Sequence, residues 1–77
     1  MTYDEFLENI DSYVGYIVEF TAIWTKDGNP AGRFQRYVWD NKEFGKPSAD
    51  RLMDITNVEI IRKAETRRTK FGMNYIV

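Results

Sequence analysis

The side chains that could perform nucleophilic catalysis are few in this chain of 77 residues. It contains no cysteine and no histidine, so the usual thiol nucleophile and the usual imidazole base are both missing. The serines are Ser12 and Ser48, and Lys46 is the lysine closest in sequence to Ser48. That spacing matches no Ser–Lys signature, and Ser48 is also well placed to cap a helix. We therefore predict no catalytic residue.

Carboxylates are the other groups with catalytic potential, and the chain has 12 aspartates and glutamates. Paired carboxylates act as acid and base in glycosidases, and converging oxygens bind hard cations. Here most acids fall on one expected helix face or in turns, where solvated carboxylates are ordinary. The segment 27–29 reads as a turn, because the calcium-loop pattern is absent, as are glycine-rich phosphate loops. The sequence predicts a non-enzymatic protein with no metal and no cofactor.

The charges are unevenly distributed, although the net charge is only −1. Residues 1–25 carry five acids and no base: Asp4, Glu5, Glu8, Asp11 and Glu19. Residues 58–77 carry five bases against two acids. This polarity from an acidic start to a basic end is the most informative feature of the sequence, because such asymmetry points to a charged partner.

The location of the protein is predicted by elimination. No apolar run approaches the roughly 18 residues that a membrane-spanning helix needs. The acidic N-terminal segment differs from a secretory signal, which begins with basic residues and then becomes apolar. We expect a cytoplasmic protein with no membrane partner.

The basic C-terminal segment contains interleaved aromatic residues. Its candidate nucleic-acid-binding residues are Arg62, Lys63, Arg67, Arg68, Lys70, Phe71 and Tyr75. Cations suit phosphate contacts, and aromatic rings suit stacking on bases. Direct nucleic-acid binding is therefore the alternative function. Two other interpretations stay open: an ordinary solvated surface, or a counter-charge to the acidic helix of the same chain or of a neighbour.

A protein partner is the function that the sequence favours. The candidate partner-binding residues are the acids Asp4, Glu8 and Asp11 and the aromatic pair Tyr37 and Trp39. Aromatic residues anchor interfaces, and an acidic face can dock on a basic partner or imitate the charge of nucleic acid. We predict a small binding protein that acts through protein–protein contact, of the accessory or inhibitor type found in mobile elements. Its expected partner handles nucleic acid, and a homo-oligomer is also compatible with the aromatic surplus.

The first half of the chain has clear secondary-structure signals. Thr2 and Glu5 form a capping box, and apolar residues then recur at helical spacing, which predicts an amphipathic helix over 3–14 that Gly15 ends. Alternation with a period of two predicts a strand over 16–25, with Tyr16, Val18, Phe20, Ala22 and Trp24 on the core face. The turn-forming segment 26–32 leads to a second strand over 33–40, so the two strands should form an antiparallel hairpin.

The second half is less regular. After a polar loop over 41–47, we predict a short helix over 49–55 capped by Ser48, with a short strand as the alternative. A third strand over 58–63, a turn over 66–69 and a fourth strand over 71–76 follow.

Together these elements predict one α+β domain over residues 1–77, an antiparallel sheet of three or four strands in the order α-β-β-α-β-β. The alternative is an SH3-like small barrel with an added N-terminal helix, in which 51–56 is a strand. The sheet face bearing Ile17, Ile23, Tyr37 and Trp39 is expected either to be an exposed patch or to be covered by loop 41–47 and the last strand.

Overall fold

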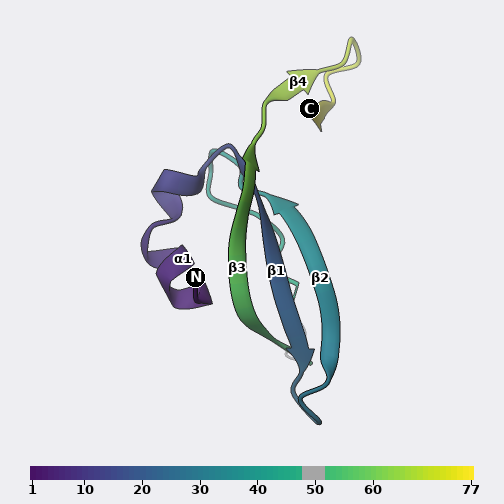
Figure 1. The fold of residues 1–77 in the computed structure, drawn as a ribbon. Coiled ribbons are helices and arrows are strands. Elements are labelled where there is room, and N and C mark those ends of the chain that lie inside the picture. The colour runs from purple at the N-terminus through teal and green to yellow at the C-terminus, as the bar shows by residue number, and fades with distance from the viewer. Residues whose placement is uncertain (48–51) are drawn as a thin grey trace.

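The computed structural model describes residues 1–47 and 52–77. Their elements are helix α1 (Tyr3–Glu8), a 3-10 helix (Ile10–Tyr13), and strands β1 (Tyr16–Trp24), β2 (Pro30–Tyr37), β3 (Met53–Lys63), β4 (Thr66–Arg68) and β5 (Asn74–Ile76). Strands β2, β1 and β3 form an antiparallel sheet in that order (Figure 1), and β4 and β5 form a separate antiparallel pair. The small antiparallel α+β fold is confirmed. The barrel alternative is wrong, because the described strands form an open sheet and a separate hairpin.

The predicted capping box is present. The Glu5 backbone N–H donates to Thr2 Oγ1 at 3.1 Å, and the Thr2 N–H donates to Glu5 Oε1 at 3.2 Å. The helix itself is shorter than predicted, because Asn9 departs from helical geometry with φ −116°. The Asn9 side-chain amide donates to the Glu5 carbonyl at 3.0 Å, a local competition that disfavours helix continuation. The apolar face nevertheless continues through the 3-10 helix, as the pattern predicts.

The capping box makes stability depend on pH. Hydrogen bonds from the backbone and side chain of Thr2 lower the pKa of the Glu5 carboxyl. A carboxyl with a lowered pKa in the folded state stabilises the fold above its unfolded pKa, and this contribution is lost as the pH falls through the folded pKa. We expect Glu5→Gln to lower the melting temperature at neutral pH and the difference from wild type to shrink below about pH 4.

The control for this measurement is Glu8→Gln, which removes a charge from the other end of α1 without touching the capping box. Thermal unfolding followed by circular dichroism at pH 7 and at stepwise lower pH measures both variants. A Glu5→Gln difference that is independent of pH would contradict the assignment.

The core lies on the predicted face of β1. Five core residues have no solvent exposure: Phe6 of α1, Val18 and Phe20 of β1, Val38, which follows β2, and Val58 of β3. Phe20 lies opposite Phe34 of β2 and Val58 of β3, so its ring is at the centre of the sheet.

The loop over 41–47 covers this same face, so the alternative in which it covers the opposite face is wrong. The Phe44 ring lies 5.3 Å from that of Phe6 and 5.5 Å from that of Phe20, between ring centroids. Arg36 Nε donates to the Gly45 carbonyl at 3.1 Å, which fixes the loop against β2. The physical reason is that α1 spans only 6 residues, so it cannot cover a three-stranded sheet without a second element.

The predicted helix over 49–55 is wrong from Met53 onward, because β3 begins there; residues 49–51 lie outside the described residues. The strand alternative is confirmed for this part. Two register shifts interrupt the β1–β3 pairing. Each shift breaks the alternation with a period of two, so the sequence pattern does not indicate the first part of β3. At the shift between Thr21 and Ala22, Thr56 Oγ1 donates to the Thr21 carbonyl at 3.2 Å.

Three other predicted elements differ from the structure. Strand β2 spans Pro30–Tyr37 rather than 33–40. The predicted turn over 66–69 is wrong, because Thr66–Arg68 is strand β4, and the strand predicted over 71–76 begins only at Asn74. The turn is instead closed by Gly72, whose φ is +82° and whose N–H donates to the Thr69 carbonyl at 3.0 Å. Glycine adopts this left-handed backbone at little cost. The Thr69 hydroxyl also accepts from the Phe71 N–H at 3.3 Å and from the Met73 N–H at 3.2 Å, so the turn follows Thr69.

Candidate functional site

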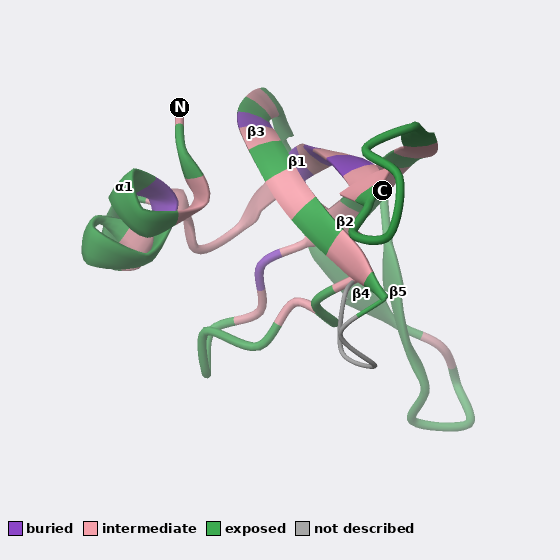
Figure 2. Cartoon of the chain, turned by 90° about the horizontal axis from the view of Figure 1, so that it is seen from below, coloured by how far each residue is buried: buried purple, intermediate pink, exposed green. Residues whose placement is uncertain are grey.

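The C-terminal hairpin, residues 65–77, projects beyond the end of the three-stranded sheet (Figure 1). It is joined to the body where the Ala64 N–H donates to the Gly15 carbonyl at 2.8 Å and Arg62 Nη1 donates to the Val77 carbonyl at 3.2 Å. All its residues are exposed except Thr69, which is half-buried, and Figure 2 shows β4 and β5 as exposed. An isolated two-stranded hairpin is marginally stable in water, so this element lacks the support that a core would give it.

The pairing register sorts the hairpin side chains into two faces. Arg67 lies opposite Tyr75, and Arg68 lies opposite Asn74. Because neighbouring residues of a strand point to opposite faces, Arg67 and Tyr75 share one face and Arg68 points to the other. At the tip, Lys70 Nζ lies 5.2 Å from the centroid of the Phe71 ring. The structure thus brings the predicted Arg67, Arg68, Lys70, Phe71 and Tyr75 together on one element.

The hairpin bases have no acidic partner among the described residues. The salt bridge recorded there joins Lys42 Nζ to Asp11 Oδ1 at 2.7 Å, within the body. The interpretation in which the acidic helix of the same chain neutralises the basic segment is therefore not what the described residues show. Arg67, Arg68 and Lys70 keep their charge available to another molecule.

The other two predicted bases lie at the end of β3. The Arg62 side chain donates the hydrogen bond to the Val77 carbonyl, so it attaches the hairpin to the body. Lys63 is exposed and pairs in register with Tyr16. Both lie next to the hairpin without belonging to it.

The predicted partner-binding residues are separated from the hairpin. Asp4 and Glu8 are exposed on α1, and Asp11 is exposed but paired with Lys42. Tyr37 and Trp39 are half-buried and pack edge to face, with 4.8 Å between ring centroids. They lie on the sheet face opposite the core, since Tyr37 pairs with Ile17, so this face is less exposed than an open patch would be.

Sequence reasoning named Phe71 and Tyr75 of the hairpin but missed the exposed side chains of Met73 and Ile76. Phe71 is 80% exposed, Met73 is 69% exposed, and Ile76 is also exposed. Their pattern looks like that of a buried strand, and only the position of the hairpin outside the sheet exposes them. No signal in the sequence separates these two situations.

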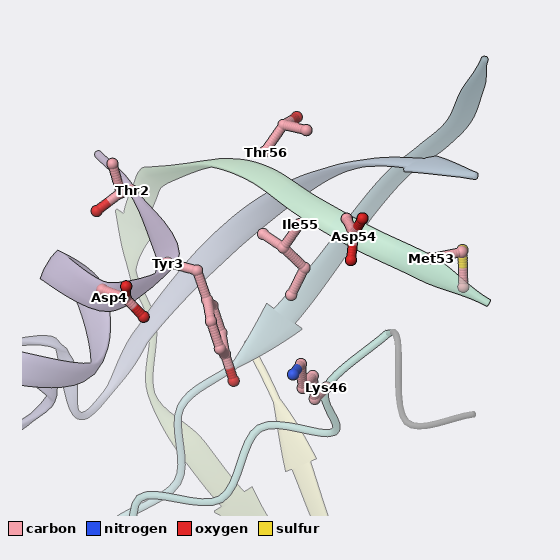
Figure 3. A pocket seen from close by; sticks show the side chains of 8 residues that line it. All are labelled: Thr2, Tyr3, Asp4, Lys46, Met53, Asp54, Ile55 and Thr56. Carbon is pink, nitrogen blue, oxygen red and sulfur yellow. The ribbon is translucent and has the colours of Figure 1, made fainter. Parts of the chain in front are cut away.

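A shallow groove of about 630 Å³ lies between α1, the start of β3 and the end of the 41–47 loop (Figure 3). Its lining residues are Thr2, Tyr3, Asp4, Lys46, Met53, Asp54, Ile55 and Thr56. Lys46 Nζ lies 4.8 Å from the centroid of the Tyr3 ring. Burial, and secondarily the charge of Asp4, raises the pKa of the Tyr3 hydroxyl.

The described residues contain neither a metal-binding cluster nor a helix that could cross a membrane. Within residues 1–47 and 52–77, no three acidic side chains gather as a metal site would require. Neither helix in those ranges has the length and apolar character to cross a membrane.

Comparison with known proteins assigns no family. No protein-family model matches the chain, and neither does any curated protein or any solved structure. Any functional inference must therefore come from the site itself.

Proposed function

We propose that this chain is a non-enzymatic binding protein that contacts a protein partner through its C-terminal hairpin. The observation that supports the proposal is the exposure of Phe71, Met73, Tyr75 and Ile76 on an element with no core of its own. Exposed apolar side chains gathered on one element are typical of interaction sites. Burial against a partner would also supply the stability that a two-stranded hairpin lacks.

The chemistry of the hairpin defines the kind of partner. Three unpaired bases, Arg67, Arg68 and Lys70, lie among the apolar side chains. A complementary surface is an apolar groove with acidic residues at its rim, because electrostatic complementarity sets specificity and association rate.

The acidic face of α1, with Asp4 and Glu8, forms a second contact surface in this proposal. An accessory or inhibitor protein whose partner handles nucleic acid would use such a face against the basic surface of that partner. The polarity of charge along the chain supports this role.

Site-specific photo-cross-linking tests the contact. A photoreactive benzoylphenylalanine is placed at Phe71 or, as the control, at Trp24, which is also an exposed aromatic residue but lies at the end of β1. In the native cell we expect a discrete protein adduct from position 71 and none from position 24. Tyr75→Ser should remove the adduct while the thermal unfolding of the protein stays unchanged. Equal adducts from both positions would contradict the proposal.

Direct nucleic-acid binding is the second candidate. It is favoured because the cation of Arg67 and the aromatic ring of Tyr75 lie on one face of the hairpin. Titration against single- and double-stranded DNA and RNA at low and moderate salt tests it. Binding that falls steeply with salt and is lost in Arg67→Glu, but not in Arg33→Glu on the body, would support this candidate. The absence of binding at low salt, or equal losses in both variants, would reject it.

A further inference from the structure

The two outer edges of the hairpin differ in charge. Strand β4 carries Arg67 and Arg68, whereas residues 73–77 around β5 carry no charged side chain and no proline. Natural proteins protect free strand edges with charges, prolines or bulges, because the unpaired backbone groups accept a further strand. The β5 edge has none of these protections.

The hydrogen bonds of the hairpin identify the backbone groups at that edge. The Glu65 N–H donates to the Val77 carbonyl at 3.4 Å, and the Val77 N–H donates to the Glu65 carbonyl at 2.9 Å. Mutual pairs of this kind recur at every second residue of an antiparallel ladder. The backbone N–H and carbonyl groups of Tyr75 therefore also point toward β4. It follows that the N–H and carbonyl groups of Asn74 and Ile76 point outward.

We propose that two copies of this chain associate by antiparallel pairing of their β5 strands about a twofold axis at Tyr75. Asn74 of each copy then lies opposite Ile76 of the other, and their outward groups make four hydrogen bonds. Tyr75 meets its counterpart as a pair without hydrogen bonds, the position where cross-strand side chains approach most closely. The result is one four-stranded sheet in the order β4-β5-β5-β4.

The charge distribution favours a second copy as the occupant of this edge. In the four-stranded sheet the two β4 strands are outermost, three strand spacings or about 14 Å apart. This separation exceeds the Debye length of about 8 Å at physiological salt, so the bases of the two copies are largely screened from each other. Because β5 carries no charged side chain, pairing of two β5 strands also places no unpaired charge at the new interface.

The inference goes beyond the proposed function, because it uses the edge of the hairpin and leaves its faces free. A twofold axis perpendicular to the sheet places Arg67 and Tyr75 of both copies on the same side, which makes the contact surface bivalent. The pairing closes on itself and does not propagate into a fibre. Because only a short strand is buried, the dimer is weak and forms at high concentration.

Sedimentation equilibrium of the full chain, from about 10 µM to about 1 mM, tests the pairing of a weak dimer. We expect the apparent mass to rise from one chain toward two. Ile76→Pro removes an outward N–H donor from each copy and leaves the hairpin's own ladder intact, so the association should weaken at least about ten-fold. The matched control is Thr66→Pro, which changes an outward position on the β4 edge, and it should dimerise like the wild type.

Three outcomes would overturn the inference. The first is a one-chain mass for the wild type at the highest concentration. The second is an equal loss in Ile76→Pro and Thr66→Pro, since this would place the contact elsewhere. The third is a monomeric wild type whose cross-link from Phe71 is lost in Ile76→Pro, because the edge would then receive a foreign strand. Cross-linking from Phe71 is scored separately, so failure of the dimer is distinguishable from failure of the proposed function.

Discussion

Phe20→Ala is expected to remove a large part of the stability of this protein. The Phe20 side chain has no solvent exposure, and its ring centroid lies 5.6 Å from that of Phe6 and 5.5 Å from that of Phe44. Truncation of a buried phenylalanine costs about 3–5 kcal/mol, because apolar burial is lost and a cavity remains. A domain of this size has a free energy of unfolding of roughly 4–12 kcal/mol. Urea unfolding followed by tryptophan fluorescence measures the loss.

The matched control is Phe71→Ala, the same substitution at the exposed tip of the hairpin. Phe71 is 80% exposed, so the free energy of unfolding should change by no more than about 0.5 kcal/mol. Similar losses in the two variants would mean that Phe71 is buried in solution, by the body or by a second copy. Repeating the Phe71→Ala measurement at low protein concentration separates these two explanations.

Gly72→Val is expected to open the hairpin while the body stays folded. Gly72 has φ +82° and no atom within 4 Å of an added Cβ, so the effect of valine comes from backbone strain and not from a clash. For residues other than glycine, the left-handed conformation costs about 1–2 kcal/mol. This is a large fraction of the stability of a two-stranded hairpin. Amide hydrogen exchange by NMR should show loss of protection in β4 and β5 alone.

Gly28→Val is the control for this prediction, because Gly28 has φ +74° and equally open surroundings. Its turn joins β1 to β2 inside the three-stranded sheet, so the same strain should reduce global stability instead of opening one hairpin. If Gly72→Val lowers protection in β1 as well, the hairpin and the body unfold as one unit, contrary to our expectation.

The two hairpin proposals depend on this local independence. A hairpin that opens without unfolding the body is only weakly held, and pairing at its edge or burial of its faces would stabilise it. We therefore expect Gly72→Val to reduce both the cross-link from Phe71 and the self-association.

Several features could be predicted from local residues because they depend on local interactions. The capping box needs only Thr2 and Glu5, and the start of β1 at Tyr16 follows directly after Gly15. The core face of β1 follows from the alternation of Val18 and Phe20 with polar neighbours. The absence of thiol and imidazole chemistry follows from composition alone.

Other features were decided by contacts between distant segments. Phe44 packs on the same face as Phe6 because α1 is too short to cover the sheet, and nothing near Phe44 in the sequence specifies that face. The strand character of Met53 to Ile55 comes from pairing with β1, through register shifts that disrupt the expected alternation.

The difference between what the sequence determines and what the tertiary structure determines is greatest for the candidate site. The sequence by itself determined that bases and aromatic residues gather near the C-terminal end of the chain, because this is a matter of composition. Only the tertiary structure decided that Arg67 and Tyr75 share a face, that Arg62 attaches the hairpin, and that Met73 and Ile76 are exposed. The physical reason is that exposure depends on which strands pair with each other, and among the described strands β5 pairs with β4 and does not join the three-stranded sheet.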